Sequence, residues 1–167
     1  MPHTRPVRAT DADAIASIYD HYVAHTVVTF ELDPVAVDTM RSRIDEIAAL
    51  ALPWHVVEDD GAVLGYAYAT RWRARPAYRH SVETTVYLHP DATGRGLGRL
   101  LYGDLLNTLQ RDGYHTAIGG IALPNAASVA LHEALGFAPA GEFREVGRKF
   151  GRWIDVGFWQ RMLQDAP

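Results

Sequence analysis

Apolar side chains recur every three or four residues in four segments of the chain, which is the spacing of one face of an α-helix. We predict a first helix over residues 12–22, after a possible cap at Thr10 or Asp11, and a second that begins at Asp33-Pro34, since proline favours the first helical turn. A long third helix ends near Gly113, and a fourth covers 126–135. The apolar positions of the first three are Ile15, Ile18, Tyr19 and Tyr22; Val37, Met40, Ile44, Ile47 and Ala51; and Leu97, Leu101, Leu105 and Leu109.

Short runs of β-branched and aromatic residues between these helices predict strands. They cover residues 7–9, 54–58, 63–70, 81–88, 115–121, 142–146 and 154–159. Residues 59–61 form a tight turn between two of them, and 147–151 separates the last two. Because several neighbouring strands are joined by turns, the sequence predicts one α/β (α+β) domain over 1–167, with a mixed, mostly antiparallel sheet of about seven strands flanked by four helices.

Composition narrows the possible functions. The chain has 167 residues, 48% hydrophobic and 22% charged, and a net charge of −4, which disfavours non-specific binding to nucleic acid. It has no cysteine, so disulfides, thiolate metal sites and a cysteine nucleophile are excluded. No apolar run is long enough for a signal core or a membrane span, and we expect a cytoplasmic protein without nucleic-acid or membrane partners.

A glycine-rich turn lies between the predicted strand 81–88 and the third helix. Gly94, Gly96 and Gly98 alternate with Arg95 and Leu97. Glycines allow several backbone N–H groups to point at one anion, and a helix N-terminus adds partial positive charge, so the turn suits a pyrophosphate. The spacing differs from that of a Walker loop, which needs Gly-Lys-Ser/Thr, and of a dinucleotide fingerprint. A plain tight turn is the alternative.

The segment 93–98 resembles the Q/R-x-x-G-x-G/A motif of GCN5-related (GNAT) N-acetyltransferases, with Thr93 where Gln or Arg is usual. More closely, the chain is similar to the phosphinothricin N-acetyltransferases and amino-acid N-acyltransferases. The resemblance covers nearly the whole chain and includes residues 28–30, 72–78, 82–87, 123–125, 128–137 and 149–160. It implies a GNAT fold, acetyl-CoA as cosubstrate, direct transfer of acetyl to the amine of a small amino-acid-like substrate, and a homodimer.

The reaction requires a base, because an amine attacks a thioester only as the free base. Glu83 is the candidate, since a carboxylate within a strand is unusual, although spacing alone favours a glutamate that faces solvent. The resemblance favours the base, acting directly or through water. It also assigns to His132 protonation of the leaving thiolate or a contact near the sulfur, although a histidine on a helix surface is the simpler interpretation.

The remaining site residues follow from the resemblance. Backbone N–H groups near Tyr87 and Leu88 would bind the developing oxyanion, and Asn125 would contact the pantetheine arm, cap a helix, or do both. The full set implied for acetyl-CoA is Val86, Tyr87, Leu88, Thr93, Gly94, Arg95, Gly96, Leu97, Gly98, Asn125 and Ser128.

For the amine substrate the resemblance implies Thr29, Phe30, Arg73, Arg75, Tyr78 and Thr85. Arginine binds a carboxylate or phosphinate through two parallel hydrogen bonds, which argues against a polycationic substrate. A solvated basic loop is the alternative for these arginines. Lys149, Trp153 and Asp155 belong to a block that would shape the dimer and border the neighbouring pocket.

Two other kinds of site find no support. The eight histidines show no metal-ligand spacing, so we predict no metal. Ser128, His132 and Glu133 lie on one predicted helix and do not form a hydrolase triad. Acylation of another class of amine, and a non-catalytic acyl-CoA-binding module, remain as alternative functions.

Overall fold

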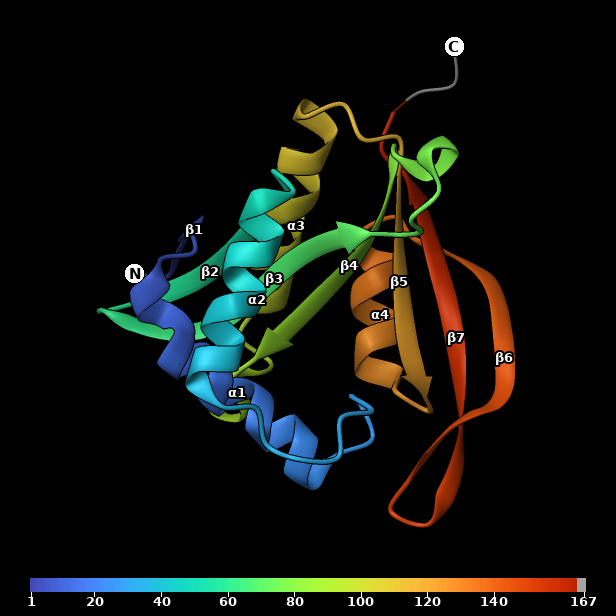
Figure 1. Cartoon of the computed structure of the whole chain (residues 1–167), viewed down its shortest axis with the longest axis horizontal. Helices are drawn as coiled ribbons and strands as arrows, with labels where there is room; N and C mark the ends of the chain where they lie inside the picture. The colour runs from blue at the N-terminus through green and yellow to red at the C-terminus, as the bar shows by residue number, and fades with distance from the viewer. Residues whose placement is uncertain (165–167) are drawn as a thin grey trace.

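The computed structural model describes residues 1–164 and contains a seven-stranded sheet with helices on both faces (Figure 1). The helices are α1 (Ala12–His25), α2 (Val37–Ala49), α3 (Leu97–Arg111) and α4 (Ala126–Ala134), with short 3-10 turns at Ala9–Asp11, Pro76–Tyr78 and Pro90–Ala92. The strands are β1 (His3–Pro6), β2 (Trp54–Asp59), β3 (Ala62–Arg71), β4 (Ser81–Leu88), β5 (Thr116–Leu123), β6 (Ala138–Lys149) and β7 (Arg152–Met162).

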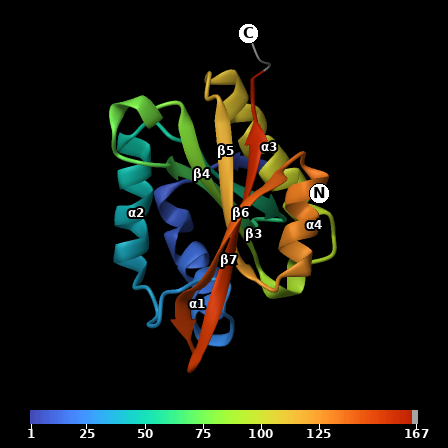
Figure 2. The same ribbon diagram turned by 90° about the vertical axis from the view of Figure 1, so that its right-hand side faces the viewer.

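The sheet has the order β1-β2-β3-β4-β5-β7-β6, and only β4 and β5 run parallel. In the view of Figure 2, α1 and α2 cover one face of the sheet, and α3 and α4 cover the other. The mostly antiparallel, four-helix arrangement predicted from the sequence is confirmed. No helix within residues 1–164 has the length and apolar character needed to cross a bilayer.

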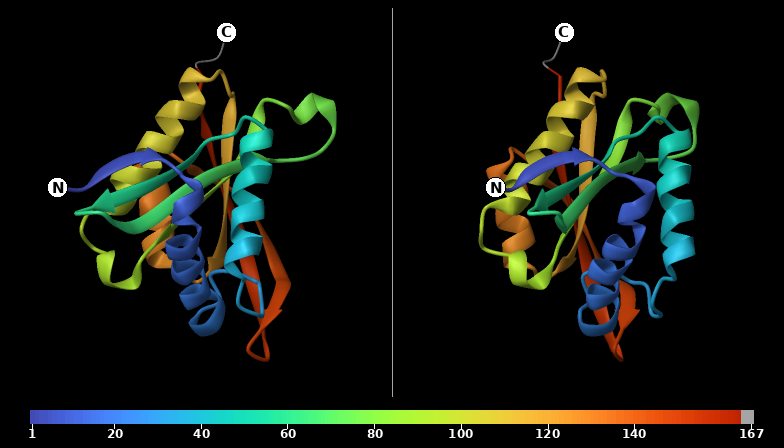
Figure 3. Two further views of the ribbon diagram at one scale, coloured as in Figure 1. Left: turned by 60° about the vertical axis from the view of Figure 1, so that its left-hand side comes forward. Right: turned by 90° about the vertical axis from the view of Figure 1, so that its left-hand side faces the viewer.

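The core forms where the apolar stripes of the helices meet the sheet. Helix α3 buries Leu101, Leu105 and Leu109 completely, and Ile15 of α1 is equally inaccessible. This burial gives each helix its stable orientation, because the hydrophobic effect scales with the apolar area removed from water. Figure 3 shows α1 and α2 lying against the half of the sheet that contains β1 to β3.

The N-terminal strand differs from the prediction of residues 7–9. The observed β1 precedes that segment, and residues 9–11 form a 3-10 turn. Arg5 of β1 is hydrogen-bonded to Asp11 and Glu58, and the Asp11 carboxylate accepts from the Arg8 N–H at 2.7 Å instead of capping α1. Backbone pairing and partly buried ion pairs therefore hold a polar edge strand that hydrophobic periodicity does not reveal.

The ends of three other elements also differ from the predicted ones. Helix α2 begins three residues after Pro34, because the Val35 N–H donates to Asp20 and keeps the chain extended there. Strands β6 and β7 are longer than predicted and are joined by a tight turn at Phe150 and Gly151, which both have positive φ angles, 51° and 74°. Such a turn matches the twist of a hairpin.

Candidate active site

The central feature of the sheet is the separation of its two halves at Glu83. Strand β4 pairs with β5 only over residues 81–83 and 116–118, although each continues along its other neighbour. The divergence is visible in Figure 1 between β4 and β5. A cavity of about 330 Å³ lies there, with walls from β4, β5, β7, α4 and the loop 26–36.

Backbone direction along β4 determines which N–H groups face this gap. Ser81 and His89, at the two ends of the strand, are hydrogen-bonded to the β3 side. Backbone groups of a strand alternate in direction, so the N–H groups of Val86 and Leu88 point toward the gap, while that of Tyr87 points to β3. Of the two N–H groups expected to bind an oxyanion, the geometry thus favours Leu88 and adds Val86.

Side chains of β4 divide between the two layers of helices. Tyr87 packs against Tyr19 of α1, with ring centroids 5.4 Å apart, and Glu83 and Thr85 share its face. Thr84 faces the opposite layer and is hydrogen-bonded to Tyr102 of α3 at 2.7 Å. Adjacent residues of β4 therefore present polar side chains to the two opposite faces of the sheet, next to the gap.

Glu83 lies in the cavity wall beside β5. A Cβ at Gly120 would lie 3.8 Å from its Oε1, so the carboxylate reaches across the gap at a point where β5 carries no side chain. Burial raises the pKa of the Glu83 carboxyl, and the Arg73 guanidinium offsets part of this rise. A carboxylate with a raised pKa is a better proton acceptor, as a general base requires.

His132 is buried on the other side of the gap and is hydrogen-bonded at both nitrogens. Its Nδ1 lies 2.7 Å from the Ser128 carbonyl oxygen, which can only accept, so Nδ1 carries the proton. Its Nε2 then accepts from the Tyr102 hydroxyl at 3.1 Å. Burial lowers the pKa of the His132 imidazole, which favours this neutral form. In this arrangement Nε2 has no proton to donate, which argues against the thiolate-protonating role and leaves a contact role.

The glycine turn and α4 lie along the same gap. Gly94 and Gly96 have φ angles of 73° and 76°, which side chains disfavour, and α3 begins directly afterwards. A Cβ at Gly98 would lie 3.3 Å from Leu131 and 3.5 Å from Leu88, so this turn packs between α4 and the end of β4. The turn can therefore present unpaired N–H groups of a helix N-terminus beside the opened strand.

Two polar groups expected at the phosphates already have partners. The Thr93 hydroxyl donates to the Pro90 carbonyl at 3.0 Å, and Arg95 pairs with Asp59 at 3.4 Å, although half of its side chain is exposed. Asn125 caps α4, its Oδ1 accepting from the Ser128 N–H at 3.1 Å, and both residues line the cavity. The cap interpretation of Asn125 is thus correct, and its amide nitrogen is left for another partner.

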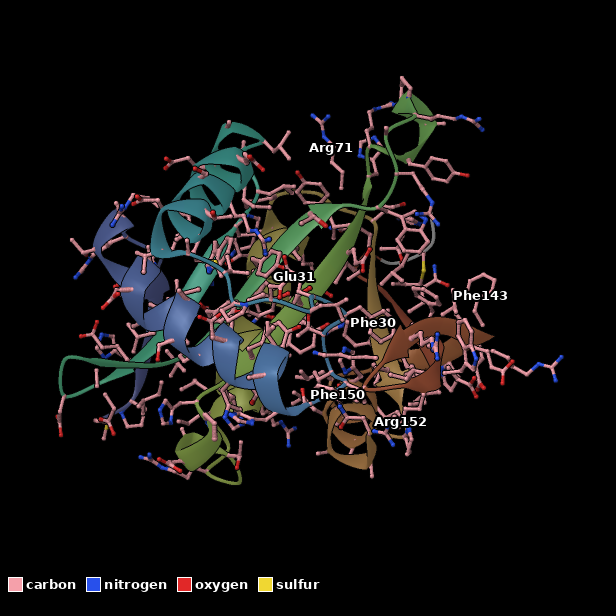
Figure 4. All side chains as sticks on the ribbon, turned by 60° about the horizontal axis from the view of Figure 1, so that its bottom comes forward. Phe30, Glu31, Arg71, Phe143, Phe150 and Arg152 are labelled. Atoms are coloured by element: carbon pink, nitrogen blue, oxygen red, sulfur yellow. The ribbon has the colours of Figure 1, made fainter. Side chains whose placement is uncertain are left out.

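The predicted substrate residues divide into two groups. Thr29, Phe30 and Thr85 line the cavity, but Arg73, Arg75 and Tyr78 do not. Arg73 lies near the edge of this cavity. Its guanidinium carbon is 4.4 Å from the centre of the Trp72 ring, and that ring contacts Phe158 of the cavity wall. Arg73 and Arg75 line a second cavity of about 320 Å³ together with Arg71 and Arg79. Figure 4 labels Arg71 and so shows where this second cavity lies.

Sequence reasoning missed the consecutive glycines of β5. A Cβ at Gly119 would overlap the His132 ring, and one at Gly120 would lie 3.3 Å from Phe158. Glycine within a strand commonly marks a close approach, so the pair was a usable signal. Tyr102 was also missed; it is fully buried on α3, where the sequence pattern drew attention to the leucines alone. Within residues 1–164 no three His, Asp or Glu side chains gather as a metal site.

Comparison with known proteins decides the family. Residues 5–157 match the model of the acetyltransferase (GNAT) domain. The chain belongs to the GNAT acetyltransferase family. It is an acetyl-CoA-dependent N-acetyltransferase, and the opened β4 strand and the glycine turn at the start of α3 fit acetyl-CoA, because together they offer unpaired N–H groups for a carbonyl and for phosphates.

Relatives of this GNAT protein are similar over almost their full length. The chain is 43% identical over 159 residues to a phosphinothricin N-acetyltransferase of Streptomyces viridochromogenes, covering 94% of this chain and 85% of the relative. It is 38% identical to an L-amino acid N-acyltransferase of Escherichia coli, over 96% and 94% of the two chains. The solved structure of a phosphinothricin acetyltransferase from Sinorhizobium meliloti, in complex with acetyl-CoA, superposes with a TM-score of 0.93 at 38% identity, covering 96% of this chain and 88% of that one.

Proposed function

We propose that this N-acetyltransferase acetylates the α-amine of a small zwitterion such as phosphinothricin, methionine sulfoximine or methionine sulfone. The relatives named for these compounds and for L-amino acids support the substrate class. The observation that carries the proposal is the half-buried Glu83 carboxylate, which lies in the wall of a cavity of about 330 Å³, a size suited to a small substrate.

In the proposed mechanism Glu83 takes the proton from the ammonium of the substrate, directly or through one water, and so produces the free amine. Bound acetyl-CoA supplies the thioester. The N–H groups of Val86 and Leu88 would bind the carbonyl oxygen as negative charge develops on it. Asn125 and Ser128 would hold the pantetheine arm, and the residues of 93–98 the pyrophosphate, through backbone N–H groups.

Arg73 is the better candidate for the substrate carboxylate, because it lies at the cavity edge and its charge reaches Glu83. Arg75 and Tyr78 would contribute only if the loop 72–80 moved toward the cavity. Thr29, Phe30 and Thr85 would contact the substrate side chain.

We further propose a single-domain, cytoplasmic homodimer. Support for self-association comes from the edge strand β6 and its hairpin, where Phe143, Val146, Phe150 and Trp153 are 58–60% exposed. Large exposed apolar residues on an edge strand favour association. Sedimentation of the purified protein tests the dimer.

The release of free CoA, followed with a thiol-reactive dye, tests the function. The chain contains no cysteine, so the protein itself gives no background. We expect rapid release with phosphinothricin or methionine sulfone and none with a polyamine. Release only with polyamines would replace the proposed substrate class, and binding of acetyl-CoA without release for any amine would favour a binding module.

A further inference from the structure

Lys149 is the only lysine among sixteen basic residues, and it is buried, with 2% of its surface exposed. Its Nζ donates to the Thr29 backbone carbonyl at 2.9 Å. Within residues 1–164 it forms no ion pair, and its ammonium lies 5.2 Å from the Phe150 ring. A buried cation without a carboxylate is costly, so its place in the fold calls for a compensating role.

The hairpin that carries Lys149 contains a bulge in β6. Phe143 pairs with Val156 and Gly147 with Ile154, so three residues of β6 lie opposite one of β7. Within this bulge Glu145 has a φ of 53°, and its N–H donates to the Asp155 carboxylate at 2.7 Å. A bulge re-aims the side chains that follow it, here those leading to Lys149.

Gly147 brings a second contact to the same loop. A Cβ at this position would overlap the Phe30 ring, so the ring lies directly on the glycine backbone. Figure 4 shows Phe30 on its loop beside the hairpin end that carries Phe150. Lys149 and Gly147 thus contact Thr29 and Phe30, two of the loop residues that line the same cavity as Glu83.

The loop is also attached to α1 and α2, in part through Thr29 itself. The Thr29 hydroxyl is hydrogen-bonded to Tyr19 at 2.7 Å, the Val35 N–H to Asp20, and Glu31 pairs with Arg43. Among the described contacts, Lys149 and Gly147 connect this loop to the other half of the sheet. The position of the Phe30 ring therefore depends on the hairpin.

We propose that Lys149 and Gly147 are positioning residues that hold Thr29 and Phe30 as one wall of the amine pocket, and so set its selectivity for the amine substrate. This rests on the proposed function, in which the cavity takes the amine. Neither residue contacts the reacting atoms. Their loss should weaken use of the amine and leave use of acetyl-CoA unchanged.

The first test replaces Lys149 by Met, which keeps the length of the side chain and removes the donor, with Arg152→Met as the control from the exposed part of the same hairpin. We expect kcat/KM for methionine sulfone to fall about tenfold or more, the scale of one lost charge-assisted hydrogen bond, with the KM for acetyl-CoA unchanged. Hydrogen exchange should quicken in 26–36 and stay unchanged in α3. Equal losses for both substrates, or unaltered exchange in 26–36, would overturn the proposal.

The second test is a double-mutant cycle between Gly147→Ala and Phe30→Ala. The added methyl group collides with the ring only while Phe30 is present, so the double variant should be no less active with the amine than Phe30→Ala alone. Additive losses would refute the contact. If the unmodified protein releases no CoA with any amine, the proposed function fails; the loop attachment is then still decided by the exchange measurement.

Discussion

Replacement of Glu83 by Gln tests the catalytic assignment most directly. The amide keeps the shape of the side chain and cannot accept the proton of the ammonium. General-base catalysis contributes about 10²- to 10⁴-fold to a rate, so we expect kcat to fall by that factor while binding of acetyl-CoA is retained.

The pH dependence of the reaction follows from the environment of Glu83. Burial raises the pKa of this carboxyl, and a base acts only when deprotonated. In the unmodified protein kcat/KM for the amine should therefore decline as the pH falls through this raised pKa. In Glu83→Gln the inflection at this pKa should be missing. The rate of the variant should follow the fraction of free amine in solution, so its deficit should shrink at high pH.

Stability should change in the opposite direction to activity. Because the native pKa of Glu83 lies above its unfolded value, the carboxylate disfavours the native state, a penalty absent at low pH that grows as the pH rises through the native pKa. Glu83→Gln should thus have a higher Tm than the unmodified protein at pH 7, with the difference vanishing in acid.

The assay is CoA release with methionine sulfone across a pH series, beside thermal unfolding of the same samples. Glu142→Gln, at an exposed position of β6, is the control for the same chemical change. Unchanged turnover in Glu83→Gln would refute the general-base assignment. A loss of turnover together with a lowered Tm would indicate damage to the fold instead of removal of a base.

Three further predictions concern Tyr102, Arg73 and Gly96. Tyr102→Phe leaves the buried Thr84 hydroxyl and His132 Nε2 without this partner, so urea unfolding should show a loss of about 1–3 kcal/mol, whereas no loss would contradict the chain of hydrogen bonds. Arg73→Ala should raise the KM for a carboxylate-bearing amine more than Arg75→Ala does, and steady-state kinetics that show the reverse ranking would place the substrate nearer the second cavity. Gly96→Ala forces a side chain onto a φ of 76°, at a cost of about 1–2 kcal/mol, and calorimetric titration should show weaker binding of acetyl-CoA; unaltered affinity would remove the turn from the site.

The elements that the sequence predicted well are those whose pattern repeats. Leucines at helical spacing predicted α3, whose observed end at Arg111 is close to the predicted end near Gly113. The alternation of a strand over 81–88 places Glu83 and Thr85 on the face opposite Thr84, as observed. Each of these follows from local geometry, because a helix or strand places its own residues on fixed faces.

Features that depend on tertiary contacts were not predictable in this way. Strand β1 is polar and is held by Arg5, and the loop 72–80 has no period, so nothing local placed Arg75 outside the main cavity. The same holds for Lys149, whose partner Thr29 is 120 positions away in the chain. In the sequence, a lysine that becomes buried cannot be told from an exposed one, because its acceptor is near it only in the folded chain.

Strands β4 and β5 pair through only three pairs of residues, so this junction is the part of the sheet with the least strand pairing. Residues 3–88 supply one leaf of the sheet and residues 116–162 the other, and only the segments 81–83 and 116–118 join the leaves by strand pairing. Such a seam is a natural boundary between units that open independently. A ligand that inserts between the leaves and bonds to both replaces the missing part of the ladder. Binding of acetyl-CoA in the gap should therefore suppress opening across the whole seam.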